Sequence, residues 1–409
     1  MKRFIFGLLC LLLASSTLAA VTVSEAYQAS LTQSEFSAHQ ASDLRQTSEG
    51  VFQAESATAI KLNGVGSTQW NTTQLTSGKD TNTSTLGLLA SLPLSPQSRL
   101  THTIDSKKAL LSSKKWSQKV ACLNLYGTVS SLFYTLLQIE STLSSQHDLL
   151  AVTQQRVNEL KQRVQIGRSK ISDVYGTELQ EKQIEASIEA LELKLNENRQ
   201  LWYQLTLLSP ESDLSRAVDL PYALPTPDYA TQISHRPDIQ ALQQHIASLK
   251  HDSQAIQDGG LPDWESQVQG QYVLSPSINK FNLLAGITVN FPWSDGGFIA
   301  SQTREAQEKV IQKELELNSQ TRAAHTQIKT TYENFSKWLK HLQTLEKAVL
   351  AANKNYLAVT QDYDRHLVTN LEVLQALNLN YTAKQDRDTG LFQAQLAYIQ
   401  LKLSMGEMP

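Results

Sequence analysis

The sequence predicts a mainly α-helical fold with a small β portion, in which very long helices pair as antiparallel coiled coils. Three observations predict it. The 409 residues contain only 11 prolines, and none lies at 97–209 or 293–408, intervals far longer than an ordinary helix. Apolar residues recur within these intervals at steps of three and four, the period of a coiled-coil seam. Shorter segments elsewhere alternate apolar and polar residues, the period of a β-strand.

The composition excludes two classes of protein. With 41% hydrophobic and 18% charged residues, the chain is too polar for a polytopic helical membrane protein. A net charge of -3 gives no basic face for displacing counterions from phosphates, so no nucleic-acid partner is expected.

Residues 1–20 read as a Sec-type signal peptide. Lys2 and Arg3 precede an apolar run at 4–13, and small residues lead to cleavage after Ala19 or Ala20. The chain is therefore expected to be exported. No other segment approaches 18 consecutive apolar residues, so no transmembrane helix is predicted. The mature chain keeps Cys122 alone, which can close no intrachain disulfide.

The mature chain contains two copies of one unit. Pro93 and Pro292 each close an apolar run ahead of a long proline-free stretch, and they stand 199 positions apart (93 to 292). Asp173 and Glu372 have the same offset (173 to 372). Two anchors at one offset indicate duplication. We therefore divide the chain into a first repeat at 21–232 and a second at 233–409, joined by a proline-rich linker.

Each repeat has the same order of elements: a helix, two strands, a long helix and a return helix. The helix of the second repeat begins at Pro237, a residue favoured in a first helical turn. The predicted ranges of the first repeat are 23–57, 58–73, 84–94, 98–163 and 173–208. Those of the second repeat are 237–257, 265–274, 281–291, 298–363 and 371–403.

The four strands raise the question of what covers them. Segment 281–291 alternates apolar and polar residues, as a strand does with one face on an apolar medium. Strands of about ten residues can cross a bilayer when tilted. Lipid tolerates no open sheet edge and four strands cannot close a barrel, so a membrane location requires several chains. On alternation alone, a small soluble sheet packed on helices is an equal alternative.

The long helices require partners of similar length. In the second repeat a seam runs from Ile328 through Tyr332 and Phe335 to Tyr363. A helix over 298–363 is about 100 Å long at 1.5 Å per residue, which exceeds an ordinary domain core. The aromatic residues Tyr332, Trp338 and Tyr356 are expected to pack in this seam.

Each long helix is followed by a turn with a specific sequence. Segments 164–174 and 363–374 read as a helix end, a short turn and a new helix with an acid in its first turn. Gly167 suits the left-handed backbone at a helix C-terminus. Asp173 and Glu372 lie at the positive end of a helix dipole, the more common role for such acids when considered alone.

These features together resemble the TolC-like outer membrane efflux family. The resemblance rests on the duplicated unit, the two hairpin tips, the Arg236-Pro237-Asp238 helix start, Leu261-Pro262 before a strand, and the exit sequence Pro292-Trp293-Ser294-Asp295-Gly296-Gly297. It covers essentially the whole mature chain. It implies a homotrimer in which four strands per chain form a twelve-stranded transmembrane β-barrel, continued by a periplasmic α-barrel of long helices.

The resemblance also implies roles for the tips. The expected gate residues are Ser172, Asp173, Tyr363, Arg365 and Glu372. The expected adaptor contacts are Gly167, Arg168, Ser169, His366 and Leu367. The second tip departs from the family pattern at three positions: a glycine is His366, a basic gate residue is Val368 and an acid is Gln375. Tight closure is therefore in doubt, and Arg365 is the candidate to replace the lost basic group.

The implied function is a passive outer membrane exit channel, for efflux of small molecules or type I secretion of proteins. A periplasmic adaptor and an inner-membrane pump or ABC transporter would open it. No enzyme activity, cofactor or metal is expected, since the nine histidines lack ligand spacing and no nucleophile–base pair stands out. The leading alternative is a periplasmic adaptor or coiled-coil scaffold without a barrel, although an adaptor normally has one hairpin. An exported enzyme ranks third.

Overall fold

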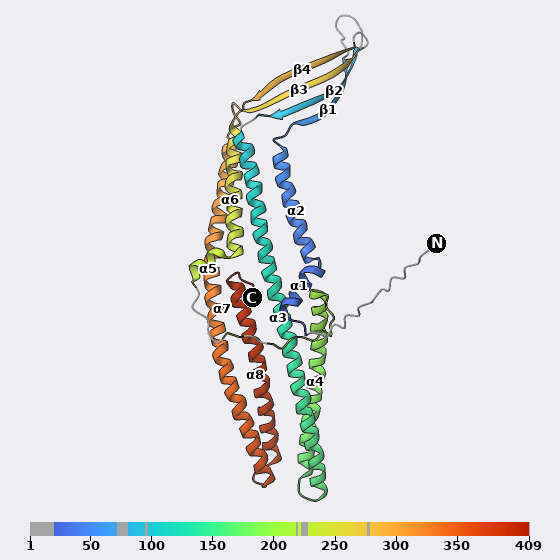
Figure 1. Cartoon of the computed structure of the whole chain (residues 1–409), viewed down its shortest axis with the longest axis vertical. Coiled ribbons are helices and arrows are strands. Elements are labelled where there is room, and N and C mark those ends of the chain that lie inside the picture. The colour runs from blue at the N-terminus through green and yellow to red at the C-terminus, as the bar shows by residue number, and fades with distance from the viewer. Residues whose placement is uncertain are drawn as a thin grey trace, which may run out of the picture. The chain divides into compact units, whose positions relative to one another are not determined.

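The computed structural model describes residues 20–71, 81–94, 97–217, 220–221, 228–275 and 279–408. The predicted signal peptide therefore lies outside the described residues, apart from Ala20. Figure 1 shows the elements along the chain. They are, in order, α1 (Val23–Gln33), α2 (Glu35–Ser56), β1 (Lys61–Asn71), β2 (Thr81–Pro93), α3 (Gln97–Gln165), α4 (Ile171–Thr206), α5 (Tyr229–His235), α6 (Pro237–Gln257), the 3-10 helix η1 (Asp258–Gly260), β3 (Asp263–Leu274), β4 (Asn279–Asn290), α7 (Phe298–Asp364) and α8 (Asn370–Ser404).

The mainly α fold with a small β portion is confirmed. The two long helices begin and end within two residues of the predicted bounds, and the two return helices and four strands lie where they were expected. The first helical stretch is broken at Ser34, which caps α1 in an extended conformation. Helix α5 was not predicted: it lies in the proline-rich linker, where Thr231 Oγ1 donates to Asp228 Oδ2 (2.6 Å) in its first turn.

The chain forms two compact units. The first contains residues 1–37, 124–226 and 330–409, and the second contains 38–123 and 227–329. Each unit combines segments from both predicted repeats. The boundaries of the repeats in the sequence are therefore not the boundaries of the compact units. The duplication itself remains a prediction, supported by the geometry of the hairpin tips described below.

The core of the first unit is aromatic and aliphatic. Trp202 of α4 and Phe133 of α3 are 1% and 2% exposed, with ring centroids 6.0 Å apart. Their neighbours include Tyr27 of α1 and Phe392 of α8. Among the described helices, α3 has an 18-residue window of mean hydropathy 1.4, long and apolar enough to cross a membrane by composition alone. Within the protein, 39% of that window is buried, and α3 supplies many residues of this core.

Packing explains the aromatic seam of α7. Phe335 is 1% exposed and lies with Ala397 and Leu401 of α8, and Tyr332 and Trp338 pack against the same cluster.

The second unit contains the four-stranded sheet. Its strand order is β1-β2-β3-β4, and every neighbouring pair is antiparallel. The β1–β2 and β3–β4 pairs confirm the predicted hairpins. The β2–β3 pair, in which Ser84 lies opposite Leu274 and Pro93 opposite Glu265, joins the strands of the two repeats. Among the described strands, β1 and β4 are therefore the edges.

The strand registers sort the side chains onto two faces. Directly opposite residues share a face, and the chain of pairs Leu62–Ala90–Val268–Ala285 defines the first. This mostly apolar face carries Leu62, Trp70, Leu86, Leu88, Ala90, Leu92, Trp264, Val268, Tyr272, Leu274, Phe281, Leu283, Ala285, Ile287 and Val289, together with the polar Thr68, Asn82, Ser84, Ser266 and Asn279. The opposite, polar face carries Asn63, Ser67, Gln69, Thr83, Thr85, Ser91, Glu265, Gln267, Gln269, Gln271, Asn282, Thr288 and Asn290, together with the apolar Val65, Leu89, Val273 and Leu284.

The apolar face is exposed. Leu62, Leu88 and Leu283 are 76%, 67% and 71% accessible. A small soluble sheet packed on helices would bury this face, so the structure favours the alternative in which the sheet lies in a membrane.

The Arg236-Pro237-Asp238 sequence anchors the start of α6. The Arg236 guanidinium donates to both carboxylate oxygens of Asp238 (3.0 and 2.8 Å) and to Gln327 Oε1 of α7 (3.1 Å). Pro237 occupies the first helical turn, where its missing N–H costs no hydrogen bond. The motif therefore fixes where α6 meets α7.

Candidate functional site

The two hairpin tips have the same backbone geometry. Gly167 and His366 have φ of +72° and +63°, and they stand 199 positions apart (167 to 366). After each, an N–H reaches back to the carbonyl five residues earlier, from Arg168 to Arg163 (2.8 Å) and from Leu367 to Asp362 (2.9 Å). This is the Schellman ending of a helix. The same turn at the spacing of the repeat supports duplication.

The left-handed turn strains the second tip, because His366 has a β-carbon where the first tip has glycine. We expect His366→Gly to stabilise the second tip by about 1 kcal/mol and Gly167→Ala to destabilise the first by a similar amount. Amide hydrogen exchange in the last turns of α7 and α3 measures both effects. Slower exchange near 366 and faster exchange near 167 are expected. An unchanged rate in both variants would contradict the strain.

The two acids of the tips cap the return helices. The Asp173 carboxylate accepts hydrogen bonds from Ser169 Oγ (3.1 Å) and from the Lys170 N–H (3.4 Å). The Glu372 carboxylate accepts from the N–H (2.6 Å) and Oγ1 (3.0 Å) of Thr369, a capping box. The Thr369 N–H and then its hydroxyl lower the pKa of Glu372. Its capping is therefore complete at neutral pH and is lost as the pH falls through that lowered pKa.

The other residues expected at the tips lie mostly on the surface. Among the gate residues, Ser172, Arg365 and Glu372 are exposed, and Asp173 is half-buried. The expected adaptor contacts Gly167, Arg168, His366 and Leu367 are exposed, and Ser169 is half-buried.

Tyr363 differs from these residues because it is buried, with 8% of its surface exposed. The guanidinium carbons of Arg156 and Arg163 lie 3.9 and 4.9 Å from the centre of its ring. Both arginines come from α3, so the ring of the second hairpin is held by cations of the first. The role expected for Arg365 stays a prediction.

A chain of hydrogen bonds links the two hairpins next to this ring. Arg156 Nε donates to Asn370 Oδ1 (2.9 Å), and Asn370 Nδ2 donates to Thr177 Oγ1 (3.1 Å). Glu159 accepts a hydrogen bond from Arg156 (3.0 Å) and forms an ion pair with Arg163 (2.6 Å). We call these residues the tip cluster: Arg156, Glu159, Arg163, Thr177, Tyr363 and Asn370.

The inner residues of the tip cluster are shielded from water, whereas the Arg163 and Glu159 side chains are 24% and 41% exposed. Asn370 and Thr177 are 5% and 0% exposed, and the Arg156 side chain is 12% exposed. Charge-assisted hydrogen bonds in such surroundings are stronger than on an open surface. Apart from Tyr363, the sequence did not point to these residues, because their partners lie up to 214 positions away.

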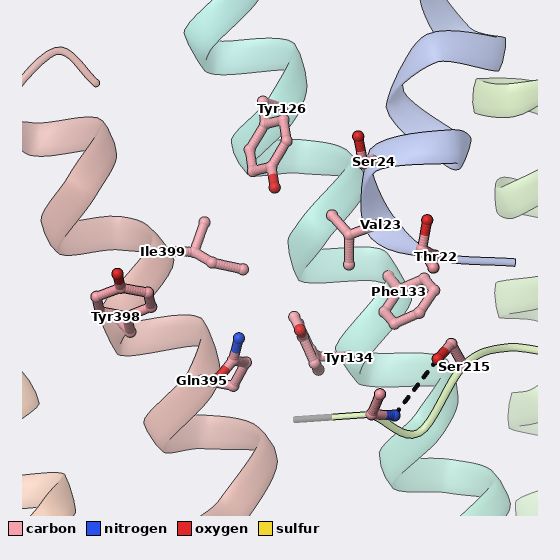
Figure 2. A pocket seen from close by; sticks show the side chains of 11 residues that line it. Thr22, Val23, Ser24, Tyr126, Phe133, Tyr134, Ser215, Gln395, Tyr398 and Ile399 are labelled. Atoms are coloured by element: carbon pink, nitrogen blue, oxygen red, sulfur yellow. Dashed lines mark hydrogen bonds between the residues drawn. The ribbon is translucent and has the colours of Figure 1, made fainter. Parts of the chain in front are cut away.

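A cavity of about 210 Å³ lies in the first unit, away from the tips. Figure 2 shows Tyr126 and Tyr134 of α3 and Tyr398 of α8 around it. Burial raises the pKa of Tyr134 to about 12. Its described lining contains no histidine, cysteine, lysine or carboxylate, and Thr22 is already engaged in capping α1. The lining therefore offers no nucleophile with an adjacent base.

Comparison with curated proteins gives distant sequence relatives, and no protein-family model matches the chain. The outer membrane protein TolC of Vibrio cholerae serotype O1 is 21% identical over 301 residues, which is 68% of this chain and 67% of TolC. The TolC of Escherichia coli (strain K12) is 22% identical over 123 residues, 30% of this chain and 25% of the relative. The match to the second protein thus spans a quarter of its length.

Solved structures match nearly the whole chain. CusC, whose structures concern folding and transmembrane channel formation, gives a TM-score of 0.85 at 14% identity, covering 94% of this chain and 92% of CusC. The outer membrane protein VceC from Vibrio cholerae gives 0.82 at 16% identity, covering 94% and 96%. The chain is therefore similar to TolC in sequence and has the fold of the TolC-like outer membrane channels.

Proposed function

We propose that this protein is a passive outer membrane exit channel. The observation that carries the proposal is the sheet: one face is mostly apolar and exposed, the other is mostly polar, and each strand leads to or from a helix. Such a sheet separates lipid from a water-filled lumen. The helices α3 and α7, of 69 and 67 residues, are long enough to extend the lumen into the periplasm.

The proposed assembly is a homotrimer. Lipid does not tolerate the free backbone groups of β1 and β4, and four strands are too few to close a barrel. Pairing β1 of one chain with β4 of the next removes both edges, and three copies give the twelve strands that the resemblance to the TolC-like family implies. The common fold with CusC and VceC supports this assembly.

The proposed gate lies at the hairpin tips. The tip cluster would keep this gate closed. In it, Arg156 and Asn370 hold the α7–α8 hairpin against the α3–α4 hairpin of the same chain. In the trimer, the half-buried Asp173 and the exposed Glu372 would form rings of charge around the entrance, alongside their capping role. Ser172 and Arg365 would line the same entrance. His366, Val368 and Gln375 make this gate looser than the family pattern.

The proposed partners dock at the tips. Ile166, Ile171, Leu367 and Leu371 are 64%, 53%, 69% and 63% exposed around the expected contact residues. Exposed apolar side chains at this density favour a protein partner, here a periplasmic adaptor. An inner-membrane pump or ABC transporter would supply the energy and select the cargo, either small molecules or secreted proteins. The channel itself would carry out no chemistry.

The channel proposal is preferred to a periplasmic adaptor or scaffold without a barrel. In a soluble scaffold, the exposed apolar face of the sheet would be in contact with water. The structural neighbours named above are an outer membrane protein and a protein that forms a transmembrane channel.

Cell fractionation tests the proposal. We expect the mature protein to sediment with the outer membrane, to run as a trimer in mild detergent and to conduct ions in planar bilayers. Recovery as a soluble periplasmic monomer would contradict all three expectations.

A further inference from the structure

Two histidines and an aspartate meet where α3 packs against α6. His102 and Asp105 lie one turn apart on α3, and His251 lies near the end of α6. One potential ligand atom from each of the three residues lies within 4.8 Å of the other two. The sequence predicted no metal because His102 and His251 are far apart along the chain. The fold brings their rings to 5.8 Å between centroids, stacked at 27°.

The packing of α3 against α6 fixes this meeting point. Ser106 Oγ lies 3.0 Å from Ser248 Oγ, and Ser113 Oγ donates to the Ala241 carbonyl (2.7 Å). As positions rise along α3, their partners fall along α6, so the helices are antiparallel in one register. Small, buried serines let the two backbones approach closely. One further turn along this register places His102 opposite His251.

The site contains polar atoms that lack partners. The Nδ1 atoms of His102 and His251 are buried and have no hydrogen-bond partner among the described residues. Asp258 Oδ2 of η1 is also buried without a hydrogen bond, and it lies 3.9 Å from His102 Nε2. Leaving a buried polar atom without a hydrogen bond destabilises the folded protein. A cation held by the two histidines and Asp105 would give their unpartnered ring nitrogens a ligand bond.

We infer that His102, Asp105 and His251 form a structural zinc site, with a water molecule as the fourth ligand. Two imidazoles and one carboxylate suit Zn²⁺. Ca²⁺ and Mg²⁺ prefer oxygen ligands alone, and Cu⁺ prefers sulfur, which none of these residues supplies. Tetrahedral zinc with bonds of about 2.0–2.1 Å places its ligand atoms about 3.4 Å apart. Rotation of the side chains closes the remaining gap.

The position of the site gives it a structural role. Helix α3 follows β2 and helix α6 precedes β3, and these two strands are neighbours in the sheet. Figure 1 shows both helices ending at the sheet. Zinc at this point fastens together the helices that carry the two central strands. The inference stands on the second unit alone and does not depend on the channel proposal.

Zinc binding to the purified full-length mature protein tests the site. The tag-free protein in detergent is stripped with a chelator, dialysed and titrated with ZnCl₂ by calorimetry. We expect one Zn²⁺ per chain and a rise in the melting temperature on binding. His251→Gln and Asp105→Asn should each weaken binding at least tenfold and reduce that rise. The matched control is His147→Gln, an exposed histidine on the same helix, which should bind as the wild type does.

Two outcomes would overturn the site. One is the absence of saturable binding by the wild type; the other is equal affinity in the wild type, His251→Gln and Asp105→Asn. Circular dichroism and the oligomeric state establish that the variants are folded. Co²⁺ gives a readout on the wild type alone, in which intense visible d–d bands are expected from a tetrahedral site. A weak octahedral spectrum would contradict the proposed ligand set.

Discussion

Replacing Leu88 by arginine is expected to abolish assembly in the outer membrane. Leu88 is 67% exposed on the apolar face of a central strand, opposite Gly64 and Gly270. An arginine facing lipid near the middle of a barrel costs about 2–4 kcal/mol, and a trimer would carry three of them. The measurement is the amount of trimer recovered from the outer membrane fraction by semi-native electrophoresis.

Leu89 supplies a matched control for this experiment. It is the same residue type at the next position of β2, and it lies on the polar face opposite Asn63 and Gln269. We expect Leu89→Arg to assemble at close to the wild-type level, because its guanidinium would face the lumen. Equal recovery of the two variants, whether both assemble or both fail, would contradict the assignment of the faces.

Replacing Arg156 by alanine is expected to open the channel in the absence of an adaptor. The change removes the cation above the Tyr363 ring, the hydrogen bond to Asn370 and the ion pair with Glu159. A loss of about 2 kcal/mol between the hairpins raises the open-to-closed ratio about thirtyfold. Single-channel recording of the purified protein in planar bilayers measures the open fraction.

Further variants separate opening of the gate from general damage. Asn370→Ala should also open the channel, whereas Arg168→Ala, at an exposed position of the first tip, should not. Asp173→Asn and Glu372→Gln should lower cation selectivity with little effect on the open fraction. Each variant is first confirmed as a trimer. An open fraction of Arg156→Ala equal to that of Arg168→Ala would remove the tip cluster from the gate.

The long helices could be predicted from the sequence because their signals are local. Proline is excluded from a helix interior, so Pro93 and Pro292 place the starts of α3 and α7 to within a few residues. Gly167 marks the first turn by its backbone freedom. Helix α5 was not predicted, because its seven residues lie in a linker rich in proline, where no helix was expected.

Contacts distant in sequence could not be predicted. The β2–β3 pair joins strands from different repeats. The alternation of apolar and polar residues within one strand does not identify the strand that pairs with it. Tyr363 was singled out, but the arginines over its ring lie on another hairpin. His102 and His251 likewise meet only through the register of two helices. Residues whose function depends on a partner far along the chain can be identified only once the fold is known.

The most direct test of the trimeric channel is disulfide crosslinking between the two edge strands. Cysteines are placed on β1 at Ser67 and, one at a time, at polar-face positions of β4 (Asn282, Thr288 and Asn290) in a Cys122→Ser background, and cells are oxidised. If β1 of one chain pairs with β4 of the next, one position should give covalent dimers and trimers, and no larger species, in the outer membrane fraction. Monomers at every position, or a ladder that continues beyond three chains, would contradict a closed barrel of three subunits.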